Sequence, residues 1–254
     1  MLMWPISAVL GFEISTAYQD TAPKFMLDEQ GQATGICVDI FAALEKQDPQ
    51  LVFTQPNYYT PLKRIFYAIE TGSLMAYCGA GYNKIRAGKM LYSQVPLYRV
   101  STRMLISREN DNPYPNIQAL KNDADLGFYS INGTSTHNLL IKMGFKMHGH
   151  YVKTLQQGLG LALSDSYNVF VYHSLGLNYA LAQNTSDQTK QTQNKNNKGN
   201  KWQGLKLIPI SLRDYQHWMV FSQKIKKAPL KRINDALKKL REQKVIDKII
   251  KKYQ

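Results

Sequence analysis

The chain has 254 residues, enough for one large domain or for two lobes of about 100 residues each. Apolar residues make up 44% of the sequence, which permits a sizeable core and excludes wholesale disorder. No run of about 18 apolar residues occurs, so the sequence offers no candidate membrane-spanning helix.

The net charge of +14 is of a size typical of nucleic-acid-binding proteins, but the charge is unevenly placed. Residues 224–254 carry a net charge of +9 and residues 184–201 carry +3, so the rest of the chain is nearly neutral. The first region is typical of a solvated helix face and the second of a surface insertion. We therefore expect no nucleic-acid partner, and binding to an anionic membrane surface is also disfavoured.

Residues 1–11 form a short apolar segment without the basic residues that open a secretory signal. Two interpretations stay open: the remnant of a truncated signal peptide, or a hydrophobic segment that packs on the domain.

Two cysteines, Cys37 and Cys78, are too few for a disulfide scaffold and lack the spacing of a zinc module. Each can be a small buried apolar residue, or the two can form a single bridge; the sequence leaves both alternatives open. His148 and His150 have no further ligands nearby, so we expect neither a metal site nor a cofactor.

The first part of the chain predicts strands alternating with helices, the pattern of an α/β protein. The expected strands are residues 13–18, 51–54, 74–81 and 103–107. The expected helices include residues 40–44 and a segment from about residue 61, which Gly72 ends. A breaker at residues 111–115 separates this part from a second α/β unit.

The second unit has expected strands at 126–129 and 169–172, with helices that follow residue 135 and cover 155–163 and 175–181. Residues 184–200 contain no aliphatic or aromatic side chain, which predicts a flexible surface loop of low complexity. Apolar character returns at residues 205–210, and 218–221 predict a strand. The C-terminus predicts helices with apolar stripes at Leu230, Ile233, Leu237 and Leu240 and at Ile246, Ile249, Ile250 and Tyr253.

An ordered set of short motifs runs along the chain over roughly residues 12–183 and 203–254. Its members are Pro23 with Phe25, the Gly35–Ile40 segment, the Gly72–Leu74 step, Arg86, Ser93 with Pro96 and Tyr98, Gly133–Ser135, Ile233–Leu240 and Ile249–Tyr253. No one motif is specific, but their order resembles that of the family-3 bacterial extracellular solute-binding proteins, of the polar amino-acid-binding type.

The resemblance implies a two-lobed α/β fold, the type II periplasmic-binding-protein fold, with a hinge and a ligand cleft between the lobes. It places lobe 1 at residues 12–104 and 209–254, and lobe 2 at residues 105–208. It also implies a periplasmic monomer that captures a small molecule for an ABC importer and does no chemistry on it.

The same resemblance indicates the binding residues. Arg86 matches an arginine that grips the ligand's carboxylate, and a guanidinium suits that role because it is planar and stays charged. Thr134 and Ser135 stand at a predicted helix start, where N–H groups and the helix dipole favour an anion; simple N-capping is the alternative. Candidate residues of the cleft wall are Tyr18, Tyr59, Gly81 and His173.

The chain also departs from the amino-acid binders it resembles. His173 stands where they carry the acid that holds the ligand's ammonium, and Asn168, Met75 and Gly81 replace other polar positions. An anion grip is therefore kept and the ammonium grip is lost. We expect an anionic, carboxylate-bearing or neutral polar ligand rather than a cationic one.

Two other functions compete with transport. A sensor that reports to a membrane signalling protein has the same binding features. A dehydratase-like enzyme on this fold needs a positioned acid/base pair, and the sequence supplies His173 without an evident second group.

Overall fold

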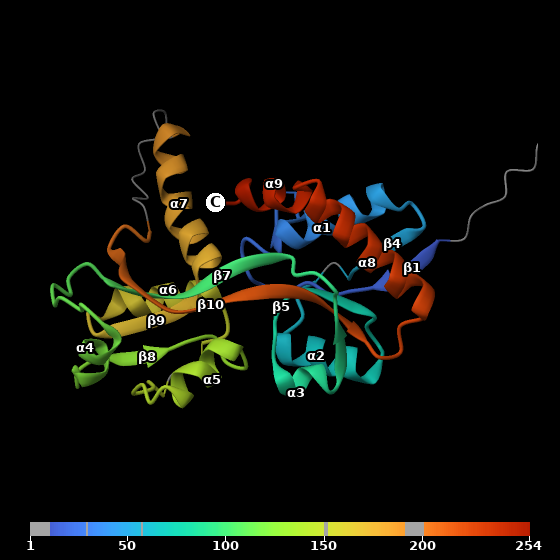
Figure 1. Cartoon of the computed structure of the whole chain (residues 1–254). Coiled ribbons are helices and arrows are strands. Elements are labelled where there is room, and N and C mark those ends of the chain that lie inside the picture. The colour runs from blue at the N-terminus through green and yellow to red at the C-terminus, as the bar shows by residue number, and fades with distance from the viewer. Residues whose placement is uncertain (1–10, 29, 57, 150–151, 191–200) are drawn as a thin grey trace, which may run out of the picture.

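A computed structural model describes residues 11–28, 30–56, 58–149, 152–190 and 201–254. The N-terminal segment, interpreted from sequence as a signal remnant or a packed lead-in, lies outside these residues except for Gly11. The protein is a mixed α/β structure of two lobes joined by two long strands (Figure 1). Within the described residues, no helix is both long and apolar enough to cross a bilayer.

Lobe 1 begins with two parallel strands, β1 (Phe12–Ser15) and β4 (Leu51–Thr54), which flank helix α1 (Ile36–Gln47) in sequence. Helix α2 (Leu62–Thr71) ends at Gly72, whose φ of 81° suits the left-handed turn that closes the helix. The lobe also holds the short strand pair β2 (Met26–Leu27) and β3 (Ala33–Thr34). It continues with β5 (Ala76–Gly81), α3 (Lys84–Ala87) and β6 (Met90–Tyr92).

The chain returns to lobe 1 at its end, where α8 (Lys227–Glu242) and α9 (Val245–Lys251) pack against α1 (Figure 1). The buried residues of α8 include Ile233, Leu237 and Leu240, three of the four residues of the first predicted stripe. Leu230 is only partly buried. The predicted apolar stripe thus faces the core of lobe 1, and the basic residues of α8 are left largely at the surface.

Lobe 2 contains the parallel pair β8 (Gly127–Tyr129) and β9 (Asn168–His173), surrounded by helices. These helices are α4 (Ile117–Asn122), α5 (Ser135–Lys142), α6 (Leu155–Ser164) and α7 (Ser174–Lys190). Two hydrophobic clusters lie on the sheet, one around Tyr129 and Phe170 and the other around Phe128 and Val171. Lobe 2 therefore has core clusters of its own, separate from the cluster of lobe 1.

Strands β7 (Tyr98–Ser107) and β10 (Leu205–Ser222) pair antiparallel and run from one lobe to the other (Figure 1). They lie in one six-stranded sheet of order β5-β10-β7-β9-β8, with β6 paired to β10. The register between β7 and β10 shifts twice, between Ile208 and Ser211 and between Ser211 and Arg213. Ile210 and Leu212, beyond the expected lobe boundary at residue 209, pack on a lobe 2 cluster.

Two sequence predictions need correction. Helix α7 continues through Lys190, so the first seven residues of the predicted loop 184–200 are helical; residues 191–200 lie outside the described part of the chain. A helix that has already begun can extend into a polar segment, because elongation is easier than nucleation. Residues 205–222 form one continuous strand rather than two separate apolar segments, since pairing with β7 sustains the polar middle.

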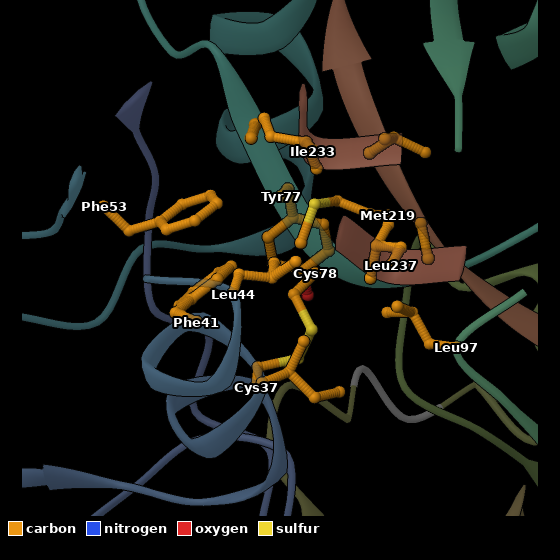
Figure 2. Close-up of a cluster of buried hydrophobic side chains, with 14 of the residues drawn as sticks. Cys37, Phe41, Leu44, Phe53, Tyr77, Cys78, Leu97, Met219, Ile233 and Leu237 are labelled. Atoms are coloured by element: carbon orange, nitrogen blue, oxygen red, sulfur yellow. A yellow bond between two sulfur atoms is a disulfide. The ribbon is translucent and has the colours of Figure 1, made fainter. Parts of the chain in front are cut away.

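A disulfide joins Cys37 at the start of α1 to Cys78 in β5, which settles the alternatives that the sequence left open. Both cysteines are fully buried, and Figure 2 shows the bridge among Phe41, Leu44 and Leu237. The bridge ties α1 to strand β5 within the largest core cluster.

Candidate ligand-binding site

A cavity of about 60 Å³ lies between the two lobes. A single bound water needs roughly 10–15 Å³, so the cavity holds several waters or one small solute. Its wall is formed by Gln19, Thr21, Lys24, Leu62, Phe66, Tyr77, Gly79, Ala80, Gly81, Arg86, Thr134, Ser135, Thr136, Tyr172, His173, Tyr215 and His217. The lining residues include no aspartate or glutamate.

The two lobes approach closely at this cavity. A Cβ placed on Gly81, at the end of β5, would lie 3.6 Å from Ser135 Oγ at the start of α5. Ser135 Oγ also accepts a 2.9 Å hydrogen bond from Arg213 Nη2 of β10. The two lobes are therefore in contact beside the cavity.

Arg86 lies in the wall on the lobe 1 side. Its backbone N–H donates to Asn83 Oδ1, the N-cap of α3, over 3.0 Å, and its Nη1 donates to the carbonyl of Gly81 over 3.0 Å. The guanidinium stacks over the ring of Phe66 at 4.3 Å from its centroid. Burial lowers the pKa of Arg86, yet a guanidinium remains charged at neutral pH. These contacts fix the orientation of the guanidinium. No lining residue is a carboxylate that could pair with it.

Thr134 and Ser135 face the cavity from lobe 2. Thr134 is the N-cap of α5: its Oγ1 accepts from the backbone N–H of His137 over 3.3 Å and donates to the carbonyl of Ile131 over 2.7 Å. The capping alternative thus holds for Thr134, and it coexists with a place in the wall. The positive end of the α5 dipole lies at the cavity, which favours an anion there.

Lys24 is the least expected residue in the wall. Its side chain comes from the loop after β1 and is 5% exposed. Nζ donates to Tyr77 Oη over 2.7 Å and to Gln19 Oε1 over 2.9 Å, and it lies 3.5 Å from the Gly79 carbonyl. All three acceptors are neutral. Because burial without a counter-charge disfavours the charged form, it lowers the pKa of Lys24 to about 7.

Two glycines make the position of Lys24 possible. The N-terminus of α1 donates to the Lys24 carbonyl through Cys37 N over 3.0 Å, and a Cβ on Gly35 would lie only 2.7 Å from that same carbonyl oxygen. Gly79 has a φ of 83°, and a Cβ there would lie 2.5 Å from Lys24 Cδ. Without a side chain, Gly35 leaves room for the backbone carbonyl of Lys24, and Gly79 leaves room for the Lys24 side chain.

Two histidines from different strands meet in the wall. His173, at the end of β9, accepts a 3.0 Å hydrogen bond at Nδ1 from the backbone N–H of Gly176, so a neutral ring carries its proton on Nε2. Its ring centroid is 5.6 Å from that of His217, whose Nδ1 lies 3.1 Å from Tyr98 Oη. Burial lowers the pKa of His173 to about 3 and that of His217 well below its usual range.

The predicted tyrosines lie elsewhere. Tyr59 lines a second cavity of about 390 Å³, which also lies between the lobes and is called the outer cavity here. It shares Gln19 and Leu62 with the 60 Å³ cavity, called the inner cavity. The exposed Asp20 stands in that outer cavity. Tyr18 lies in the core of lobe 1, where its hydroxyl donates to Gln55 Oε1 over 2.7 Å, and it is not among the lining residues of either cavity.

The structure thus brings together Arg86, Gly81, Thr134, Ser135 and His173 of the predicted site residues. The sequence analysis missed Lys24, Gln19, Tyr77, Tyr172, Tyr215 and His217. One signal was available: Lys24 stands between Pro23 and Phe25, which the sequence analysis used only as a motif of the family resemblance. Asp39, within the Gly35–Ile40 motif, has a structural contact, because its carboxylate accepts from Lys252 Nζ and Tyr253 Oη at the C-terminus.

The two lobes, the paired crossing strands and the cavity between the lobes define a binding protein of the two-lobed periplasmic type. The profile of the bacterial extracellular solute-binding proteins, family 3, matches residues 14–254. The chain therefore belongs to this family.

Solved structures agree on the fold. A histidine kinase sensor domain with similarity to periplasmic binding proteins superposes with a TM-score of 0.77 at 15% identity, covering 96% of each chain. The arginine-, lysine-, histidine-binding protein ArtJ from Geobacillus stearothermophilus gives 0.74 at 16% identity, covering 95% of each chain. An ancestral amino acid-binding protein, a precursor of cyclohexadienyl dehydratase, gives 0.72 at 16% identity and 95% of each chain. Comparison with curated protein sequences finds no match.

Proposed function

We propose that this protein captures a small, carboxylate-bearing anion between its lobes and passes it to an ABC importer. One observation carries the proposal: the cavity wall holds Arg86, Lys24 and the start of α5, and its lining residues include no carboxylate. An anion can satisfy these groups, whereas an ammonium group would meet two cationic side chains and no acid.

The groups that we propose to bind the carboxylate come from both lobes. Arg86 comes from lobe 1, and the Thr134–Ser135 helix start comes from lobe 2. Neither lobe alone supplies both a guanidinium and the N-terminal end of a helix, so a carboxylate held by both favours the closed state. The lobe limits that we propose, 12–104 with 209–254 and 105–208, place these two groups on opposite sides of the hinge.

The proposed setting is the periplasm, where the protein acts as a monomer. Membership of an extracellular family supports this location. The Cys37–Cys78 disulfide supports it as well, because disulfides form and persist in oxidising compartments.

A sensing role is the second candidate, favoured by the structural similarity to a histidine kinase sensor domain. The binding step is the same in both roles, so the partner distinguishes them. Co-purification with a permease would support transport, and co-purification with a membrane kinase would support sensing.

Turnover of the ligand is the third candidate. The sequence showed His173 without a second titratable group, but the structure places His217 and Lys24 in the same wall. We propose binding without chemistry, because burial lowers the pKa of His173 to about 3 and that of His217 well below its usual range, which makes both rings weak bases at neutral pH. Incubation of the protein with its ligand, followed by NMR of the solution, is expected to return the ligand unchanged.

A thermal-shift screen against organic acids, amino acids, polyamines, oligosaccharides and phosphonates tests the proposal. A ligand at 100 times its Kd adds about 2.7 kcal/mol to the stability. We expect organic acids to stabilise the protein. Arg86→Ala is then expected to weaken binding by about 2–5 kcal/mol, and Arg86→Lys to restore only part of the loss.

Arg64→Ala is the matched control, because Arg64 is exposed on α2 and the variant loses the same charge. It is expected to bind as the wild type does. Tight binding of arginine or of a polyamine, unaffected by Arg86→Ala, would contradict the proposed site.

A further inference from the structure

A buried lysine, Lys24, adds a second cationic group to the cavity wall beside Arg86 and the start of α5. Lys24 is more than nine-tenths buried and lines the same cavity. Its three nearest acceptors are an amide oxygen, a phenol oxygen and a backbone carbonyl. None of these carries a negative charge, so the ammonium form of Lys24 has no counter-ion in the wall.

The groups around Lys24 supply no negative charge to the inner cavity. His173 and His217 lie in the same wall, and the positive charge of Lys24 helps to keep both imidazoles neutral. The nearest acid in the chain sequence, Asp20, is exposed and stands in the outer cavity. The inner cavity therefore concentrates positive potential at two points, Arg86 and Lys24.

Both groups are anchored on strand β5, within two residues of each other. Lys24 Nζ lies 3.5 Å from the carbonyl oxygen of Gly79, and Arg86 Nη1 lies 3.0 Å from the carbonyl oxygen of Gly81. Gly79 and Gly81 are two residues apart, so their Cα atoms are separated by at most about 7 Å. A short carbon chain with an anionic group at each end spans such a distance.

The size of the cavity points in the same direction. At about 60 Å³, the inner cavity has room for a compact solute. The aromatic rings of Phe66, Tyr77, Tyr172 and Tyr215 form much of the remaining wall, and they suit the carbon atoms between two polar ends.

We propose that the ligand is a compact dicarboxylate, with one carboxylate held by Arg86 and the start of α5 and the other held by Lys24. This assignment rests on the proposed function and specifies its substrate class. Lys24 is then the residue that distinguishes dicarboxylates from monocarboxylates of the same length.

Isothermal titration calorimetry with two pairs of probes tests the assignment: succinate against butyrate, and glutarate against pentanoate. The wild-type protein is expected to bind each dicarboxylate at least about tenfold more tightly than its partner. Lys24→Met keeps much of the side-chain volume and removes the charge. It is expected to lower the affinity for the dicarboxylates to near that for the monocarboxylates, and to weaken monocarboxylate binding by a clearly smaller factor.

Controls separate this assignment from the proposed function. Lys238→Met removes one exposed charge from α8 and is expected to leave all four affinities unchanged. Arg86→Ala is expected to weaken binding of all four probes. Circular dichroism melts establish that each variant is folded, and Lys24→Met is expected to fold because it removes a buried, uncompensated charge.

Two outcomes would overturn the assignment while leaving the proposed function in place. One is equal binding of the paired probes by the wild type; the other is a dicarboxylate affinity that Lys24→Met does not change. In both cases Arg86→Ala would still weaken binding. If none of the four probes binds while an amino acid or a polyamine does, the assignment and the proposed function fail together.

Discussion

Lys24 Nζ donates a 2.7 Å hydrogen bond to Tyr77 Oη, and these two residues come from segments that lie 53 positions apart in the chain. Tyr77 in turn donates to Gln19 Oε1, so the lysine, the phenol and the amide form one buried network. The network fixes the position of the ammonium group but gives it no negative charge. Because burial lowers the pKa of Lys24 to about 7, the charge of this side chain changes near neutral pH.

Stability should rise with pH above neutrality because of Lys24. The pKa of Lys24 is about 7 in the folded protein, against about 10.4 in an unfolded chain. Below pH 7 both states are protonated and the full cost of burying the charge is present. Between pH 7 and about 10 the unfolded state binds more protons, so the free energy of unfolding rises by up to about 1.4 kcal/mol per pH unit.

Urea denaturation between pH 7 and pH 9 measures this dependence. Lys24→Met is expected to be more stable than the wild type at pH 7 and to show a smaller slope. Lys238→Met should follow the wild type. Equal slopes for wild type and Lys24→Met would contradict the assigned state of the lysine.

Acid should destabilise the protein through His173 and His217. The pKa of His173 is about 3 and that of His217 is also far below its usual range, whereas both are about 6.5 when unfolded. The stability from keeping these rings neutral is complete above pH 6.5 and is lost as pH falls toward the folded pKa values. Each ring contributes a slope of up to about 1.4 kcal/mol per pH unit.

The window from pH 6.5 to pH 4.5 separates this effect from carboxylate titration. His217→Phe is expected to lose about half of the slope measured by denaturation in that window. His137→Phe, in α5 outside the cavity wall, is the comparison variant. An unchanged slope in His217→Phe would show that the ring is already protonated in the native protein.

Loss of the disulfide should weaken the protein. The bridge spans a sequence separation of 41 residues, and removal of a native bridge costs about 2–5 kcal/mol. The double variant Cys37→Ala, Cys78→Ala is expected to melt at a lower temperature than the wild type. Reductant should lower the melting temperature of the wild type toward that of the variant, and it should leave the variant unchanged.

Leu237→Ala tests the docking of the C-terminal helix. Leu237 is fully buried in the core of lobe 1, beside the disulfide (Figure 2). Truncation should cost about 2–5 kcal/mol, since it leaves a cavity that the core fills only in part. The neighbouring Lys238→Ala, on the exposed face, should cost less than about 0.5 kcal/mol. A small loss for Leu237→Ala would mean that α8 is not firmly packed.

The sequence predicted the parts of the fold that depend on local patterns. Strand β4 has the bounds that its β-branched and aromatic run indicated, and α2 ends at Gly72. The apolar spacing of Ile233, Leu237 and Leu240 correctly predicted which face of α8 is buried. These features follow from side-chain spacing along one element, which a single sequence contains.

The missed features depend on contacts between distant segments. Lys24 enters the cavity only because Gly79, 55 positions further along the chain, leaves space for its side chain. His217 meets His173 only because β9 and β10 both pair with β7 in one sheet. No spacing rule within one segment relates these residues.

The shifted register of β10 has a consequence for how the lobes part. Between Ile208 and Arg213 the regular pairing with β7 is interrupted, and Pro209 in this stretch has no N–H to donate. A strand that is released from its neighbour bends there more easily than in the flanking ladders. We therefore expect opening to be a bend at this stretch, measurable as fast amide exchange at residues 210–213. Such a bend would separate Arg213 from Ser135 while leaving the hydrogen bonding inside each lobe intact.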